Sequence, residues 1–172
     1  YERSKFMLEE AGYIEVGMDH FALPHDSLAI AMKEKSLHRN FMGYTTQNTT
    51  MMIGLGMSSI SDSWFGFAQN DKSVEGYTEQ VNKGIIPVFR GHLLSDEDLE
   101  IRKHILDLMC HFETEIKVGS IISESFNLIK ERLSEMILDE LVIINENKVT
   151  ITEKGIPFVR NCCMAFDADL NK

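Results

Sequence analysis

The segment LHRNFMGYTTQ, Leu37–Gln47, concentrates side chains that can bind a ligand. Phe41 and Tyr44 offer flat surfaces for a conjugated ring, and His38 and Arg39 offer positive charge for carboxylates. The segment shows neither a helical nor a strand period, so we expect a loop. Two hypotheses fit its composition: a loop that lines a ligand pocket, or a surface loop that an aromatic side chain anchors.

A second polar pair follows an apolar run near the start of the chain. YIEVGMDHFAL predicts one strand that carries Asp19 and His20 at its end, and open α/β folds place their ligands beyond strand ends. Asp19 and His20 are therefore candidates for the same site as the segment above.

Histidine spacing does not predict a metal site. His20 and His25 are five residues apart, and His104 and His111 are seven apart on one expected helix. Neither pair has the i, i+4 spacing of a helical metal clamp, and HExxH is absent. We expect His104 and His111 to be partly buried helix residues and assign no metal ligand.

Motifs of self-contained enzymes are also absent. The chain has no GxSxG elbow, no GxGxxG and no P-loop. We therefore predict no autonomous hydrolase, kinase or classical dehydrogenase, and we assign no catalytic residue within this chain.

Three cysteines, Cys110, Cys162 and Cys163, fit neither a disulfide framework nor a CxxC clip. We interpret them as small core residues and expect a reducing, cytoplasmic compartment.

Composition is that of a soluble globular protein: 44% of the 172 residues are hydrophobic and 26% are charged. No apolar run is long enough for a membrane helix, and no charged-then-apolar leader opens the chain. The net charge is -10, and residues 95–172 hold 16 acidic and 9 basic side chains, a net of -7. This charge argues against a nucleic-acid partner.

Helices and strands must position these candidates. Asp26 or Ser27, and Ser95 with the acidic residues after it, are typical helix starts. TMMIGLGMSSIS predicts a buried strand or a close backbone approach at its glycines, and Asn145–Asn147 lies at the turn of an expected hairpin. Helices are expected over these segments: 1–12, 26–37, 73–84, 95–112, 123–136 and one from Thr152 or Glu153.

The second half has the order helix, helix, hairpin, helix, which resembles a winged-helix domain. Its first two helices carry apolar residues on one face: Ile101, Ile105, Leu108 and Phe112, then Ile122, Phe126, Ile129, Leu133 and Met136. A net of -7 over residues 95–172 favours a structural or docking role over DNA binding.

Several stretches together resemble one family. GYIEVGMDHFALPHDSLAIA, LHRNFMGYTTQ, GLGMSSIS, FAQN and RNCCMAFD occur in the order found in the C-terminal part of oxygen-independent coproporphyrinogen III oxidase, a radical S-adenosylmethionine enzyme of haem biosynthesis. The resemblance covers essentially the whole chain. It implies an oxidoreductase that converts two propionates of coproporphyrinogen III to vinyl groups and so gives protoporphyrinogen IX.

The resemblance also implies a fold and its domains. Residues 1–63 would be the last strands and helices of an incomplete (β/α) barrel, an α/β part. Residues 64–94 would connect it to a mainly helical α+β domain with a small hairpin, residues 95–172. The CxxxCxxC motif that holds the family's [4Fe-4S] cluster is absent from this chain, so we expect the fragment alone to be inactive.

The resemblance assigns roles to only a few individual residues. It assigns Phe41, Met42 and Ile60 to the S-adenosylmethionine pocket. The family has glutamine where this chain has Met42, and a thioether lacks the donors of an amide. For the substrate we name Arg39, Tyr44 and His20, with Arg39 as a candidate partner of a propionate.

Two alternatives stay open. Relatives of this enzyme act as haem-binding chaperones, and their equivalent segment reads more like RHNLNYW than HRNFMGYTTQ. The other alternative is a structural docking domain that binds no porphyrin. As partners the enzyme interpretation implies an electron donor and an electron acceptor, no nucleic acid and no membrane, and a monomer at full length.

Overall fold

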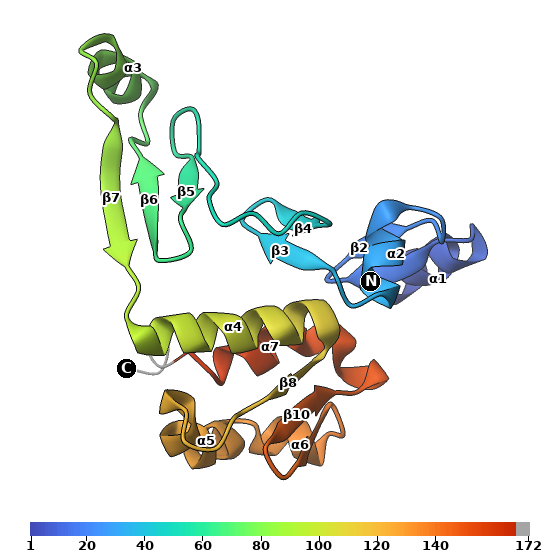
Figure 1. Ribbon diagram of the computed structural model, residues 1–172. Coiled ribbons are helices and arrows are strands. Elements are labelled where there is room, and N and C mark those ends of the chain that lie inside the picture. Colours follow the sequence, from blue (N-terminus) through green and yellow to red (C-terminus); the bar gives the residue numbers. More distant parts are fainter. Residues whose placement is uncertain (168–172) are drawn as a thin grey trace. The chain divides into compact units, whose positions relative to one another are not determined.

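The computed structural model describes residues 1–167 and contains two compact units (Figure 1). The first unit consists of Tyr1–Gln47 and Glu100–Lys172, and the second consists of Asn48–Leu99. The last five residues of the predicted 95–172 domain lie outside the described part. Helices alternate with small antiparallel sheets, in agreement with the predicted mixed fold class.

The first two helices are confirmed, although α2 ends at Lys33, before the end of the predicted segment 26–37. Helix α1, Glu2–Glu10, is followed by Gly12 at φ +86°, a left-handed conformation that ends helices. Helix α2, Ser27–Lys33, has Asp26 as its N-cap, and the carboxylate accepts a 2.8 Å hydrogen bond from the Leu28 amide. Both ends are therefore set by local chemistry.

The predicted single strand over YIEVGMDHFAL is wrong, because the chain reverses in the middle. Strands β1, Ile14–Gly17, and β2, His20–Ala22, pair antiparallel. Met18 and Asp19 between them have φ of +42° and +63°, as in the two-residue turns whose twist suits a hairpin. Asp19 therefore lies in the turn, and His20 begins the returning strand.

LHRNFMGYTTQ is a hairpin, and the predicted loop is wrong. Strands β3, His38–Asn40, and β4, Gly43–Thr45, pair antiparallel around the turn residues Phe41 and Met42. The Asn40 side-chain oxygen accepts a 2.8 Å hydrogen bond from the Met42 amide and so stabilises the turn.

The second unit is a three-stranded antiparallel sheet with one helix. Its strand order is β5-β6-β7, and α3 connects β6 to β7. The predicted helix is confirmed, with Ser73 as its N-cap and Gly84 at φ +71° after its end. The bounds are β5, Ile60–Asp62; β6, Gly66–Asn70; α3, Val74–Asn82; and β7, Val88–Leu93.

The segment TMMIGLGMSSIS is mostly irregular, so the predicted buried strand is wrong. The predicted close backbone approach at its glycines is confirmed. A Cβ atom at Gly54 would lie 2.7 Å from the Ile60 carbonyl oxygen. Only the last residues of the segment enter β5, and Met52 forms an isolated bridge with Asp62.

Helix α4, Asp96–His111, begins as predicted with a capping box. Ser95 Oγ accepts from the Asp98 amide at 3.2 Å, and Asp98 accepts from the Ser95 amide at 2.9 Å. The predicted hairpin around Asn145–Asn147 is confirmed as β9, Val142–Asn145, and β10, Lys148–Ile151. Strand β8, Glu113–Glu115, adds a third strand that was not predicted. The helix expected over 123–136 divides at Leu133 into α5 and α6.

The remaining elements complete the first unit. Thr152 caps a 3-10 helix, η1, which precedes α7, so the helix expected from Thr152 or Glu153 begins in 3-10 form. The bounds are β8, Glu113–Glu115; α5, Ile121–Arg132; α6, Ser134–Leu138; β9, Val142–Asn145; β10, Lys148–Ile151; η1, Glu153–Phe158; and α7, Val159–Met164.

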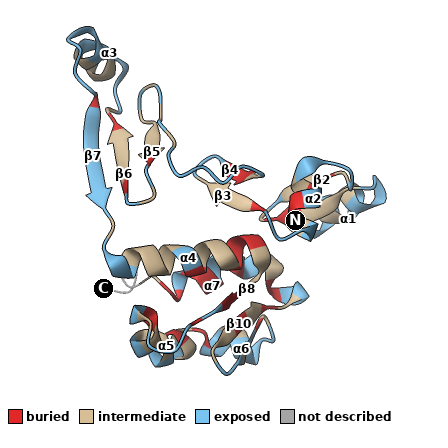
Figure 2. Ribbon diagram, in the orientation of Figure 1, coloured by how far each residue is buried: buried red, intermediate tan, exposed pale blue. Residues whose placement is uncertain are grey.

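The apolar core of the described chain lies in the first unit (Figure 2). Leu108, Ile129 and Leu133 from the predicted apolar faces are fully buried, and the other predicted face residues are buried or pack against the core. All three cysteines are buried, as predicted. Within the described residues no helix is both long and apolar enough to cross a membrane.

Candidate functional site

Arg39, Tyr44 and His20, the three residues named for substrate binding, lie together in the first unit. Arg39 and Tyr44 are directly opposite each other on β3 and β4, and the guanidinium carbon lies 4.7 Å from the centre of the Tyr44 ring. The His20 ring meets the same ring edge-on, with centroids 5.1 Å apart. One aromatic ring therefore orients both side chains.

Tyr44 itself is buried, at 8% exposure, and its hydroxyl is engaged. The hydroxyl donates a 2.8 Å hydrogen bond to the Met109 carbonyl on α4. Burial raises the pKa of Tyr44 to about 12, so the hydroxyl remains a neutral donor near neutral pH. A ligand would meet little more than the edge of this residue.

Arg39 carries a buried nitrogen that has no acceptor. Its Nη1 is shielded from solvent and makes no hydrogen bond within the described residues. The positive charge of Arg39 lowers the pKa of the Cys110 and Cys163 thiols, but burial raises it more. The pKa of Cys110 is raised to about 12, and both thiols are neutral. A buried N–H without an acceptor is costly, and a carboxylate or carbonyl oxygen would satisfy it.

Phe41 and Met42, named for cofactor binding, form the tip of the β3–β4 hairpin. Phe41 is 51% exposed and Met42 is 86% exposed. Exposed apolar side chains at a tight turn are able to pack on a flat ligand. Ile60, the third residue of this set, is half-buried on β5 of the second unit, where it pairs with Gln69.

Asn70 organises the glycine-rich segment before Ile60, a role that sequence reasoning missed. Its amide donates to the carbonyls of Gly54 and Gly56 at 3.0 and 2.9 Å. Asn70 is only 6% exposed, although nothing in β6 marks it as buried by alternation. The available signal was FAQN, which follows the glycine-rich segment in the sequence.

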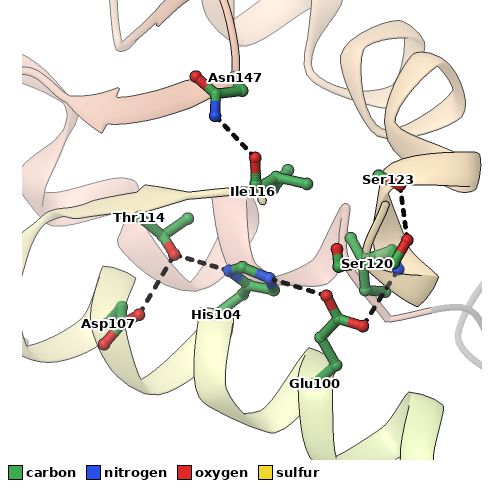
Figure 3. Close-up of polar contacts among 9 residues, drawn as sticks. Glu100, His104, Asp107, Thr114, Ile116, Ser120, Ser123 and Asn147 are labelled. Carbon is green, nitrogen blue, oxygen red and sulfur yellow. Dashed lines mark hydrogen bonds and ion pairs between the residues drawn. The ribbon is translucent and has the colours of Figure 1, made fainter. Parts of the chain in front are cut away.

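A second polar cluster connects α4 with β8 and α5 (Figure 3). His104 Nδ1 lies 2.7 Å from Thr114 Oγ1, and its Nε2 lies 3.8 Å from a Glu100 oxygen. Thr114 also donates to Asp107 at 3.4 Å. Glu100 accepts from the Ile122 amide at 3.3 Å, in the first turn of α5.

The hydroxyl, imidazole and carboxylate of this cluster are in the order of a hydrolase triad, but their burial excludes that role. Thr114 is 4% exposed, so a substrate cannot reach its hydroxyl. Burial is the main cause that lowers the pKa of His104, although the Glu100 carboxylate opposes it. The cluster is therefore a structural network around a neutral imidazole, and His104, which was predicted to be partly buried, is buried.

The Glu100 carboxylate remains ionised in this network. Burial raises its pKa, but hydrogen bonds from the amides that open α5 hold it below its ordinary value. Within the described residues no group of three or more histidine, cysteine or acidic side chains is arranged to hold a metal ion.

Comparisons with known proteins point to one class, the oxygen-independent coproporphyrinogen III oxidases, and no family model matches the chain. The chain is 41% identical over 170 residues to the oxygen-independent coproporphyrinogen III oxidase of Salmonella typhimurium and 37% identical over 174 residues to that of Escherichia coli. Each alignment covers 96% of this chain and 37% of the relative.

A solved structure agrees. It is described as a coproporphyrinogen III oxidase from Escherichia coli and a radical SAM enzyme; it matches with a TM-score of 0.91 and 36% identity over 98% of this chain and 40% of that chain. The predicted resemblance is thereby confirmed, and the chain spans well under half the length of these relatives.

Proposed function

We propose that this chain is the C-terminal part of an oxygen-independent coproporphyrinogen III oxidase. The full-length enzyme would convert two propionates of coproporphyrinogen III to vinyl groups, which gives protoporphyrinogen IX in haem biosynthesis. The 41% identity over 96% of the chain supports this function. In this proposal, residues 1–63 would complete the barrel of the enzyme. Residues 64–94 would connect them to residues 95–172, which would form a winged-helix-like domain that covers the barrel.

The iron-sulfur cluster would be held by another part of the enzyme. The chain has no CxxxCxxC motif, and its three cysteines are buried thiols whose raised pKa values disfavour the thiolate that a cluster needs. In the full-length enzyme, the cluster and S-adenosylmethionine together would supply the radical chemistry for the decarboxylation. The chain alone would therefore be inactive.

Phe41 and Met42 fit the wall of an S-adenosylmethionine pocket. Both are apolar and exposed at a turn whose backbone is fixed by Asn40. Phe41 can stack on a flat ring, whereas Met42 offers a soft apolar contact and no amide donor. The cofactor would therefore be held at Met42 by packing alone. Ile60 would contribute a further apolar contact.

Arg39 provides the observation that carries the substrate assignment. Its buried Nη1 lacks an acceptor within the described residues, and coproporphyrinogen III brings carboxylates that would fill that place. The guanidinium is oriented by the Tyr44 ring, against which His20 packs edge-on. Because a guanidinium binds carboxylates through parallel N–H donors, Arg39 would bind and orient a propionate without taking part in the bond changes.

The test is anaerobic turnover of coproporphyrinogen III by the full-length enzyme, with reconstituted cluster, S-adenosylmethionine and a reductant. Wild type should form protoporphyrinogen IX. Phe41→Ala should lower turnover about tenfold or more, because a contact to the bound cofactor is lost, with little change in thermal stability, because Phe41 is half-exposed. Arg39→Gln should raise KM for the porphyrinogen more than it lowers kcat.

Other outcomes separate the alternatives. A drop in melting temperature with full turnover per folded molecule would make Phe41 an anchor of the hairpin. A wild-type protein that binds haem without decarboxylation would be a chaperone-like relative, and one that binds no porphyrin would be a docking protein.

A further inference from the structure

Tyr44 joins parts of the first unit that are distant in the sequence. It lies on β4, two residues after the exposed Met42. Its hydroxyl donates to the Met109 carbonyl on α4, 65 residues away. The tip that is proposed to meet the cofactor is thus attached to a helix through one side chain.

Gly17 fixes the other side of this attachment. A Cβ atom at Gly17 would lie 2.7 Å from the Tyr44 hydroxyl oxygen, so β1 packs directly against the end of the ring. Gly17 also has φ +147°, which disfavours any other residue. The ring is therefore confined between β1 and the Met109 carbonyl.

The burial of Tyr44 argues against direct substrate binding. The residue is 8% exposed, and its one donor is already used by Met109. Tyr44 instead orients two neighbouring side chains, because the Arg39 guanidinium lies over its ring and the His20 ring meets its edge.

We propose that Tyr44 is a positioning residue, which fixes the Phe41–Met42 turn and the Arg39 guanidinium relative to α4 and acts on ligands only through them. The effect on ligands rests on the function proposed above. The attachment of the hairpin to α4 does not depend on that function and is measured separately.

Tyr44→Phe in the full-length enzyme removes the hydroxyl and keeps the ring. Hydrogen exchange, followed by mass spectrometry on peptides that cover residues 38–45, should become about two- to tenfold faster, as expected for the loss of one buried hydrogen bond. The specificity constant kcat/KM for coproporphyrinogen III should fall by about tenfold, mainly through KM, because Arg39 and the turn are less well oriented.

Thr114→Val is the matched control, because it removes a buried hydroxyl in the same unit that contacts His104 and Asp107 rather than the hairpin. It should lower thermal stability at least as much as Tyr44→Phe, while the exchange of residues 38–45 and kcat/KM stay at wild-type values. An equal loss of kcat/KM per folded molecule in both variants would overturn the positioning role, because general destabilisation would then explain it.

The two proposals fail in different ways. If wild type does not turn over coproporphyrinogen III, the proposed function falls, and with it the effect of Tyr44 on ligands. Unchanged exchange of residues 38–45 in Tyr44→Phe would instead overturn the attachment itself, whatever the wild-type protein catalyses.

Discussion

Arg39, which is half-buried, and His104, which is buried, are cationic or potentially cationic side chains with different surroundings. Arg39 has a shielded nitrogen without an acceptor in the described chain, whereas both ring nitrogens of His104 face a partner. Most buried polar groups in folded proteins have hydrogen-bond partners, and one without a partner requires an explanation such as a missing ligand. His111 Nε2 and Ser120 Oγ are also shielded without a partner within the described residues, so Arg39 is a candidate through the missing acceptor together with its contact to the Tyr44 ring.

The His104 cluster predicts a loss of stability in mild acid. The ordinary pKa of histidine is 6.5, and burial lowers the pKa of His104 in the folded protein below this value. Lys103 lowers it further, whereas the Glu100 and Asp107 carboxylates partly oppose the decrease. Below about pH 6.5 the unfolded chain therefore binds a proton that the folded chain does not, and the free energy of unfolding falls as the pH drops. Denaturant unfolding at pH 7.5 and 5.5 measures this difference.

His104→Gln is the comparison for that measurement. Glutamine keeps an amide between Thr114 and Glu100 but cannot titrate, so the variant should lose less stability than wild type over the same pH interval. Equal losses in the two proteins would show that other groups cause the acid sensitivity.

Asn70 gives a prediction at the level of elements, because it connects β6 to the glycine-rich segment before β5. Asn70→Ala removes two hydrogen bonds to the carbonyls of Gly54 and Gly56. We expect a cost of about 1–3 kcal/mol, the usual penalty for leaving buried polar groups without partners. Hydrogen exchange of residues 52–58 should become faster in the variant.

Gln80→Ala is a control of similar chemistry. The Gln80 amide makes one long contact of 3.4 Å to Asp71, so its removal should cost less than about 0.5 kcal/mol. Exchange of residues 52–58 that stays slow in Asn70→Ala would show that the glycine-rich segment does not depend on this side chain.

Helices were predictable because their signals are local. Each N-cap side chain accepts a hydrogen bond from an amide no more than three residues further along the chain, as at Asp26, Ser73, Ser95 and Thr152. The hairpin at β9 and β10 was also predictable, since β-branched residues flank a polar turn. The hairpins at β1–β2 and β3–β4 were not, because Met18–Asp19 and Phe41–Met42 lack the usual Asn-Gly or Asp-Gly turn signal.

The candidate site was predictable in its members and not in its contacts. Arg39 and Tyr44 are five residues apart and share a chemical signal, so sequence could name them. The bond from Tyr44 to Met109 and the contact with Gly17 join distant segments, and no local pattern encodes them. The fold thus gives Tyr44 a buried position, whereas the sequence suggested a surface for a ligand.

At the scale of the whole molecule, the two units differ in how much apolar surface they bury. The buried residues of the second unit are Asp62, Gly66, Asn70 and Pro87, and strand β7 is exposed along its length (Figure 2). Large apolar side chains remain on its surface, among them Leu55 at 83% exposure and Leu93 at 86%. Polar side-chain hydrogen bonds organise this unit in place of an apolar core.

We therefore expect residues 48–99 to be unfolded when produced alone, because hydrophobic burial is the main favourable contribution to folding. Far-ultraviolet circular dichroism and amide chemical-shift dispersion measure this directly. Residues 95–172 serve as the comparison, since Leu108, Ile129, Val149 and Phe166 form a core there, and should unfold cooperatively. A cooperative thermal transition in the isolated 48–99 segment would contradict the expectation.

The buried thiols have a practical consequence for spectroscopy. Cys110, Cys162 and Cys163 are shielded, and their raised pKa values make them slow to react with maleimides at neutral pH. Met42 is 86% exposed, so Met42→Cys would place a fast-reacting thiol at the hairpin tip. A fluorophore or spin label attached there would report on the tip against a silent background from this chain's own cysteines.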